Sequence, residues 1–146
     1  MIKRKKIINS YKVTNLNSYD CFKKISTNLK SYLIDVRTKP EWEFVGVPDL
    51  STINNSTIFI SWQEYPEMNI NKNFEKNVAQ KNINKKDYIF LICRSGRRSL
   101  KAAEYLSSLG YKHCFNISDG FERNKDNTNH RSKIGGWKFN NLPWKQ

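Results

Sequence analysis

Short apolar segments alternate along this chain with segments of helical periodicity. The segments predicted as strands are 11–13, 32–36, 58–61, 88–92 and 112–117. The segments predicted as helices are 18–29, 38–45, 73–80 and 100–109. Strands that alternate with helices form parallel βαβ units, so this order predicts an α/β fold in three layers, α/β/α, with a parallel sheet in the middle.

The first predicted helix has a clear start and a clear apolar stripe. Asn17 or Ser18 can cap its N-terminus, because both side chains accept hydrogen bonds from the first turn. Phe22, Ile25 and Leu29 follow at i, i+3 and i+7. We therefore expect these three side chains to face the core.

A single cysteine stands at the turn between the fourth predicted strand and the last predicted helix. It opens a run of seven residues: Cys93, Arg94, Ser95, Gly96, Arg97, Arg98 and Ser99. The small residues of this run let the backbone curl, so that successive N–H groups point inward as a nest for an anion. The positive end of the following helix adds to that field. These features favour the thiolate over the thiol, so we expect any chemistry of this chain to start at Cys93.

Other candidate site residues follow neighbouring strands. Asp35 and Arg37 lie at the end of the second predicted strand, and Trp62 directly follows the third. In open parallel sheets, ligands bind outside the carboxyl ends of the strands. We therefore expect these three residues to lie near Cys93 at one edge of the sheet.

The two other cysteines show no metal or disulfide pattern. Cys21 lies in the first predicted helix and Cys114 in the last predicted strand, each beside a phenylalanine. No Cys-x-x-Cys pair occurs, which argues against a disulfide framework and against a zinc site. We expect both to be small buried hydrophobes in a reducing cytoplasm. We expect no metal, no organic cofactor, and no catalytic part for His113 or His130.

The charge of the chain is strongly positive but not concentrated. The 146 residues carry a formal net charge of +13, and lysines are spread along the whole length, with one dense block at residues 3–6. The many Asn, Lys and Ile residues indicate a compositional bias. We therefore do not expect nucleic-acid binding, although the positive field would favour small anionic substrates. No apolar run approaches the roughly 20 residues of a membrane span, so no membrane partner is expected.

Composition divides the chain into three parts. Residues 1–10 are a basic start that we expect to be flexible, and residues 11–122 form one domain. Residues 123–146 begin polar and end in an aromatic run that contains Trp137 and Trp144. We expect this tail to be a strap packed on the domain. The alternatives are a contact to a second subunit in a homodimer and a partial lid over the site.

Several motifs taken together resemble a single-domain rhodanese over about residues 11–122. The matching segments are Asp-Val-Arg at 35–37, Pro-Glu-Trp at 40–42, Gly-Val-Pro at 46–48 and the cysteine run at 93–99. Many members have Gly-His-Ile-Pro where this chain has Gly-Val-Pro. The shorter motif and the Gly-Trp and Leu-Pro-Trp of the tail are similar to a bacterial subgroup.

This resemblance implies a five-stranded parallel sheet and a sulfurtransferase whose Cys93 becomes a persulfide. The expected partners are a small anionic sulfur donor, thiosulfate or a persulfide, and a thiophilic acceptor, cyanide or a thiol. Cys93 would attack the outer sulfur of the donor, and the acceptor would then take that sulfur, in a covalent two-step transfer.

The arginines of the loop have distinct expected roles. Arg94 and Arg97 would hold the anionic donor and stabilise the sulfite that leaves, through charge-assisted hydrogen bonds. In members of the resembled family the arginine that matches Arg98 is turned inward. We expect it to tie the loop to Asp35 or Glu41.

Three supporting residues complete the predicted site. We expect Ser99 to cap the following helix, with a hydrogen bond to the sulfur as a further role. Arg37 would help to hold the edge of the sheet. Trp62 has two open roles, as a wall of the pocket or as buried packing.

Three functions compete with sulfur transfer. A phosphatase or arsenate reductase on the same fold would separate its cysteine and arginine by five residues, whereas four residues separate Cys93 from Arg98. The shorter loop would make a smaller anion pocket, better suited to sulfur than to phosphate. The second competing function is a non-catalytic binding module, and the third is a basic adaptor that delivers sulfur for tRNA modification.

Overall fold

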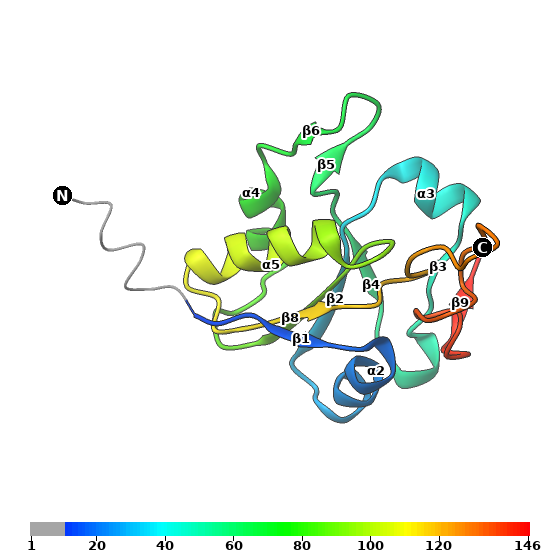
Figure 1. Ribbon diagram of the computed structural model, residues 1–146. Coiled ribbons are helices and arrows are strands. Elements are labelled where there is room, and N and C mark those ends of the chain that lie inside the picture. The colour runs from blue at the N-terminus through cyan, green and yellow to red at the C-terminus, as the bar shows by residue number, and fades with distance from the viewer. Residues whose placement is uncertain (1–10) are drawn as a thin grey trace.

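The computed structural model describes residues 11–146, in which helices cover both faces of a sheet (Figure 1). The five parallel strands of the sheet are β1 (Thr14–Leu16), β2 (Ser31–Asp35), β4 (Thr57–Phe59), β7 (Tyr88–Ile92) and β8 (His113–Ile117). Their order is β1-β8-β7-β2-β4, so β7, which leads into the cysteine loop, lies at the centre. The predicted α/β fold with a five-stranded parallel sheet is confirmed. The segment 1–10, predicted to be flexible, lies outside the described residues.

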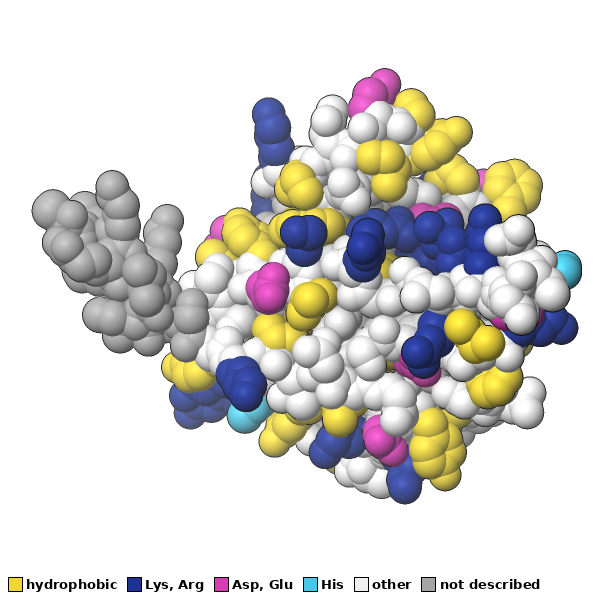
Figure 2. Space-filling model, viewed as in Figure 1, with side chains coloured by type: hydrophobic (Ala, Val, Ile, Leu, Met, Phe, Trp, Pro, Cys, Tyr) yellow, Lys and Arg dark blue, Asp and Glu magenta, His cyan; other side chains and the backbone are white. Residues whose placement is uncertain are grey.

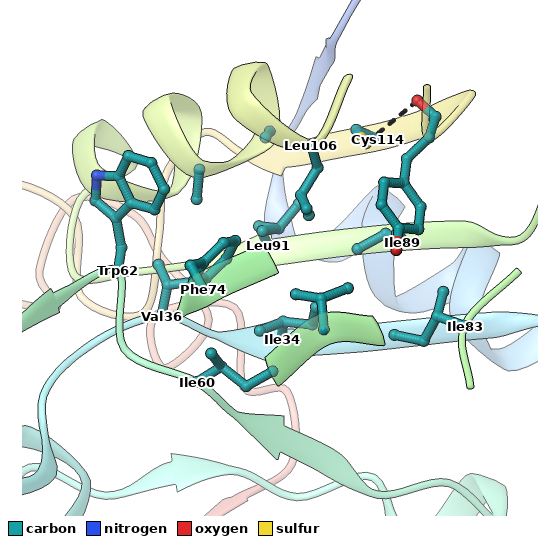
Figure 3. Packing of buried hydrophobic residues seen from close by; sticks show 14 of the residues in the cluster. Ile34, Val36, Ile60, Trp62, Phe74, Ile83, Ile89, Leu91, Leu106 and Cys114 are labelled. Atoms are coloured by element: carbon teal, nitrogen blue, oxygen red, sulfur yellow. Dashed lines mark hydrogen bonds between the residues drawn. The ribbon is translucent and has the colours of Figure 1, made fainter. Parts of the chain in front are cut away.

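Each face of the sheet carries its own hydrophobic core. One core lies under α4 (Phe74–Ala79) and α5 (Arg97–Ser108), and the other under α2 (Ser18–Thr27) and the 3-10 helix η1 (Ser51–Ile53). Side chains of β7 alternate between them: Ile89 and Leu91 face α5, whereas Phe90 and Ile92 face α2. Figure 3 shows the first core, with Leu106 of α5 near Leu91.

Helix α2 is shorter than its apolar stripe predicts. Asn17 caps it, since its side chain accepts a hydrogen bond from the Asp20 N–H at 2.8 Å. Ile25 is buried as expected, but Leu29 is 99% exposed. The prediction for Leu29 is wrong because the backbone becomes extended at Asn28, which carries the chain away from the helix toward β2.

The first strand lies three residues later than predicted. β1 covers Thr14–Leu16 instead of residues 11–13, and Thr14 pairs with Phe115 of β8 while Leu16 pairs with Ile117. Pairing with β8, rather than the apolar content of the segment, selects these residues.

Two short antiparallel pairs have no counterpart in the sequence prediction. β5 (Gln63–Glu64) and β6 (Asn69–Ile70) form a hairpin, and β3 (Val47–Pro48) pairs with β9 (Trp144–Lys145). Strands of two residues are too short to show the alternation of apolar and polar residues from which strands are predicted. The second pair fixes the end of the tail beside α3 (Lys39–Phe44) (Figure 1).

The tail packs on the domain through Trp137. This side chain is fully buried in the core on the α2 side, and its ring meets that of Phe22 edge-on at 5.7 Å between centroids. Its indole N–H donates to the Pro143 carbonyl at 2.6 Å, and its backbone N–H donates to the Gly120 carbonyl at 2.9 Å. Both N–H groups of this large buried residue are therefore satisfied.

The longest helix between residues 11 and 146 is α5, with 12 residues. Within that range, the length and apolarity needed to cross a lipid bilayer are not met by any helix.

Candidate active site

The cysteine loop joins β7 to α5 at the carboxyl end of the sheet. Cys93 directly follows β7, and Gly96 is the N-cap of α5. Gly96 has a φ of +98°, and a Cβ at this position would lie 2.4 Å from the Ser118 carbonyl oxygen. Only glycine meets both conditions without strain, so this turn depends on it.

The sulfur of Cys93 is surrounded by groups that can form hydrogen bonds with it. The backbone N–H of Gly96 donates to it at 3.1 Å and that of Ser99 at 3.4 Å, and the Ser99 hydroxyl lies 3.2 Å away. Cys93 is only 1% exposed, so these groups take the place of water. Backbone donors at the start of a helix favour negative charge on the atom that they face. The arrangement therefore suits a sulfur nucleophile.

The two other cysteines lie in apolar surroundings. Cys114 packs in the core under α5 and Cys21 in the core under α2. Burial raises the pKa of the Cys114 thiol to about 12. Burial, together with the negative charge of Asp119, also raises the pKa of the Cys21 thiol. Both thiols therefore stay protonated at neutral pH and are poor nucleophiles.

The two histidines lie away from the sulfur. His113 stacks on Tyr88 at 4.5 Å between ring centroids, and His130 lies in the exposed tail, where its Nδ1 meets the Thr128 hydroxyl at 2.8 Å. In residues 11–146, no three or more His, Cys, Asp or Glu side chains gather closely enough to hold a metal ion.

Arg94 and Arg97 lie at the rim of the loop, and both are exposed. Within residues 11–146, neither guanidinium group has a carboxylate oxygen within 4.0 Å, in contrast to Arg98. Lys and Arg side chains form a band over α5 and the loop before it, below the β5–β6 hairpin (Figure 2). The rim of the loop is therefore positively charged and open to an anion.

The backbone of the loop is bonded to the segment that follows β8. The carbonyl of Cys93 accepts from the Phe121 N–H at 2.8 Å, and the carbonyl of Arg94 accepts from the N–H groups of residues 122 and 123, each at 3.0 Å. Gly120 has a φ of +64°, and a Cβ there would lie 2.4 Å from the Arg94 carbonyl oxygen. The first half of the loop thus rests directly on residues 120–123.

Arg98 ties the loop to α3. Its guanidinium group donates to both carboxylate oxygens of Glu41, at 2.8 and 2.9 Å. Glu41 also accepts from the backbone N–H and the hydroxyl of Thr38, which caps α3. Of the two carboxylates considered as partners of Arg98, the structure selects Glu41, because Asp35 pairs with Arg37 instead.

The Arg98–Glu41 pair gives a prediction for stability against pH. Burial alone would raise the pKa of Glu41, but the hydrogen bonds and charge of Arg98 and the bonds from Thr38 outweigh it, and the pKa falls from 4.5 to about 2. The stabilisation is complete above about pH 5 and is lost as the pH falls toward 2. A shift of this size corresponds to about 3 kcal/mol, and solvent screening of the partly exposed pair reduces it to about 2 kcal/mol.

We therefore expect Glu41→Gln to lower the free energy of unfolding by about 2 kcal/mol at pH 7 and by progressively less below pH 5. Urea unfolding of both proteins at a series of pH values measures this difference. Glu43→Gln, on the same helix but exposed and outside the ion pairs, is the matched control. A difference between Glu41→Gln and the native protein that stays constant from pH 7 to pH 3 would contradict the assignment.

Asp35 and Arg37 form a fully buried ion pair beside the loop. The Nη2 atom of Arg37 lies 2.7 Å from the Asp35 carboxylate and also donates to the Gly46 carbonyl at 2.7 Å. The guanidinium carbon lies 4.5 Å from the centre of the Phe121 ring. The pair reaches the loop through Phe121, whose N–H binds the Cys93 carbonyl.

Trp62 lies in the core under α5. It is 8% exposed, and its ring meets Phe74 edge-on at 5.1 Å between centroids (Figure 3). Its ring centroid also lies 5.7 Å from that of Tyr105. Of its two predicted roles, the structure shows packing. Its cluster also contains Cys93, so it helps to form the floor on which the loop begins.

Ser99 does not cap the helix, so that prediction is wrong. Gly96 is the N-cap of α5, and Ser99 is the third residue of the helix. Its fully buried hydroxyl lies between the Cys93 sulfur and the side chain of Asn116, to which it donates at 2.5 Å. The sequence prediction did not include Asn116. The only signal for it in the sequence is an amide within the otherwise apolar segment at 114–117.

Comparisons with known proteins agree with this geometry. The family model of the rhodanese-like domain matches residues 18–127. An uncharacterized protein of Rickettsia conorii is 43% identical over 134 residues, which are 90% of this chain and 97% of that protein. The crystal structure of Rv0390 from M. tuberculosis has a TM-score of 0.84 and 34% identity, and the match covers 94% of this chain and 99% of that one.

A third similarity is more distant. The adenylyltransferase and sulfurtransferase uba4 of Ogataea parapolymorpha is 26% identical over 110 residues, which are 75% of this chain but 24% of that protein. The cysteine loop, the parallel sheet and the match over residues 18–127 lead to one conclusion: this chain belongs to the rhodanese-like domain family.

Proposed function

We propose that this protein is a sulfurtransferase in which Cys93 carries a sulfane sulfur as a persulfide. The observation that carries the proposal is the environment of the Cys93 sulfur, which faces two backbone N–H groups and a hydroxyl at the start of α5. The family and the name of the relative from Ogataea parapolymorpha point in the same direction. All three cysteines are free thiols in the structure, which fits a reducing cytoplasm.

The proposed reaction has two steps and needs no oxidant. The Cys93 thiolate attacks the outer sulfur of thiosulfate, a new S–S bond forms on Cys93, and the old S–S bond breaks as sulfite leaves with the electron pair. A thiolate or cyanide then attacks the outer sulfur of the persulfide. The product is a new persulfide or thiocyanate, and Cys93 becomes a thiolate again.

The charged residues of the loop have separate roles in this scheme. Arg94 and Arg97, exposed and without carboxylate partners among residues 11–146, bind the anionic donor and stabilise the departing sulfite. Arg98 is already engaged by Glu41, so it holds the loop in shape rather than binding the donor. Because Cys93 is 1% exposed, a slender acceptor is favoured at the sulfur.

The test is a mass measurement on the full chain. After incubation with thiosulfate, we expect the protein to gain the mass of one sulfur, located by peptide mapping on Cys93 and removed by cyanide as thiocyanate. Cys114→Ala serves as the matched control, since its buried thiol takes no part. It should gain the sulfur as the native protein does.

Two outcomes would overturn the proposal. One is the absence of any sulfur gain with thiosulfate, polysulfide and a small organic persulfide tested in turn. The other is hydrolysis of a phosphate ester that depends on Cys93, because the loop would then act as a phosphatase loop. Four residues between Cys93 and Arg98 favour the smaller, sulfur-sized site.

A further inference from the structure

A chain of buried polar groups leads from the reactive sulfur to the neighbouring strand β8. The Ser99 hydroxyl lies 3.2 Å from the Cys93 sulfur and 2.5 Å from the Oδ1 atom of Asn116. Asn116 is 2% exposed and Ser99 is fully buried, so water does not compete for these contacts. The proposed reaction assigns no part to Asn116.

The orientation of the Asn116 amide is fixed by two further hydrogen bonds. Its Nδ2 atom donates to the Gly96 carbonyl at 3.1 Å and to the side-chain oxygen of Asn15 at 2.9 Å. The Gly96 carbonyl can only accept, so the NH₂ group must lie on that side and the amide oxygen must face Ser99. An amide oxygen can only accept, and the Ser99 hydroxyl must therefore donate to it.

This arrangement creates a competition for one proton. A hydroxyl has a single hydrogen, so while Ser99 donates to Asn116, it can only accept from Cys93. That suits a thiol, whose S–H would donate to the Ser99 oxygen. A thiolate instead needs donors, and the Ser99 hydroxyl becomes one only when it turns away from Asn116.

We propose that Asn116 is a positioning residue for the Ser99 hydroxyl. While Cys93 is a thiol, the hydroxyl donates its hydrogen bond to Asn116; when the sulfur becomes a thiolate, this bond breaks and the hydroxyl donates to the sulfur. This role rests on the proposed function, in which the Ser99 hydroxyl donates to one of two partners. It turns to the sulfur in the thiolate and back to Asn116 when that charge is gone. Asn116 therefore sets how readily the resting thiol ionises.

Charged groups also lie on the elements around the loop. They come from the loop and α5, from α3, from the end of β2 and from the turn after β8, and they are Arg94, Arg97, Arg98, Glu41, Asp35, Arg37 and Asp119. Their charges are unchanged when Asn116 is replaced by another neutral residue. A comparison among neutral variants therefore isolates the hydroxyl.

The experiment follows the ultraviolet absorbance of the Cys93 thiolate against pH, with Cys93→Ser as the blank. In Asn116→Leu, which has a similar shape but no acceptor, the Ser99 hydroxyl is released to the sulfur. A hydrogen bond to a charged group favours the charged form, so we expect the midpoint of thiolate formation to move down by roughly one pH unit. Asn15→Ala is the matched control, because it removes the outer partner of the Asn116 amide and leaves the Ser99 contact; its midpoint should not move.

A second substitution separates this role from a structural one. In a Ser99→Ala background the Asn116→Leu substitution should leave the midpoint in place, because the hydroxyl on which it acts is gone. The same downward shift with and without Ser99 would overturn the proposal, as would an unchanged or raised midpoint in Asn116→Leu alone. A lower melting temperature of Asn116→Leu, from the lost bond to Gly96, would not produce the dependence on Ser99.

If Asn116→Leu does not fold, Asn116→Asp replaces it. The carboxylate accepts a stronger hydrogen bond from the Ser99 hydroxyl and adds a negative charge near the sulfur. The midpoint of thiolate formation should therefore rise, and it should rise by less in the Ser99→Ala background. An equal rise in both backgrounds would overturn the proposal. These measurements follow thiolate formation, whereas the proposed function is tested by the gain of sulfur mass. The role of Asn116 can therefore be contradicted while the sulfurtransferase proposal holds, and the sulfurtransferase proposal can be contradicted while the role of Asn116 holds.

Discussion

We expect Cys93→Ser to abolish the proposed sulfur transfer, with the turnover of thiosulfate falling by at least about 10⁴-fold. The serine hydroxyl is not ionised at neutral pH and cannot form the persulfide. The fold should survive, because a serine oxygen at this position can accept hydrogen bonds from the same N–H groups of Gly96 and Ser99. Release of sulfite from thiosulfate, measured beside the melting temperature of each protein, tests both parts.

The matched control is Cys114→Ala, which removes a buried thiol from the same core. Its turnover should stay close to that of the native protein. Residual turnover of more than a few per cent in Cys93→Ser would assign the chemistry to another group. If the Cys93→Ser protein were unfolded, its loss of turnover would say nothing about the role of the Cys93 sulfur. For that reason the melting temperature is measured in the same experiment.

Trp137→Ala is the substitution that should destabilise the protein most. Trp137 is fully buried, and truncation of a buried tryptophan to alanine costs about 3–5 kcal/mol. The substitution leaves a cavity beside Phe22 and removes the donor to the Pro143 carbonyl. Urea unfolding, followed by circular dichroism, measures the loss as a fall in the free energy of unfolding.

Phe139→Ala is the control for this substitution, because Phe139 lies two residues further along the same tail and is 48% exposed. It should change the free energy of unfolding by less than about 1 kcal/mol. If Trp137→Ala were no more destabilising than Phe139→Ala, the tail would not be part of the core. A first unfolding step confined to the tail would show that the two parts unfold separately.

The sequence predicted the fold well where each segment carries its own signal. β7 begins and ends at the predicted residues, and α3 (Lys39–Phe44) lies within the helix predicted over 38–45. The errors occur where distant residues decide. β1 is selected by its pairing with β8, and Leu29 is left in solvent because the chain must turn into β2.

The same distinction holds at the site. The loop sequence predicts a turn that points N–H groups at a sulfur, because glycine and the helix start are local features. The partner of Arg98 had to be left as a choice of two carboxylates, since only the folded chain brings Glu41 to it. Asn116 could not be identified in advance, because its neighbours Ser99 and Asn15 lie in two other elements.

The order of the strands has a consequence for synthesis of the protein. β1 is made before the other strands of the sheet, but its partner is β8, and Ser18 donates to Asp119 across 101 residues of sequence. Contacts of such separation form only after the later of the two partners has been made. The loop of Cys93 therefore lacks its supports from residues 116 and 120–123 until those residues have also been made. A nascent chain therefore carries this thiol before the contacts that hold its loop in the folded domain can form.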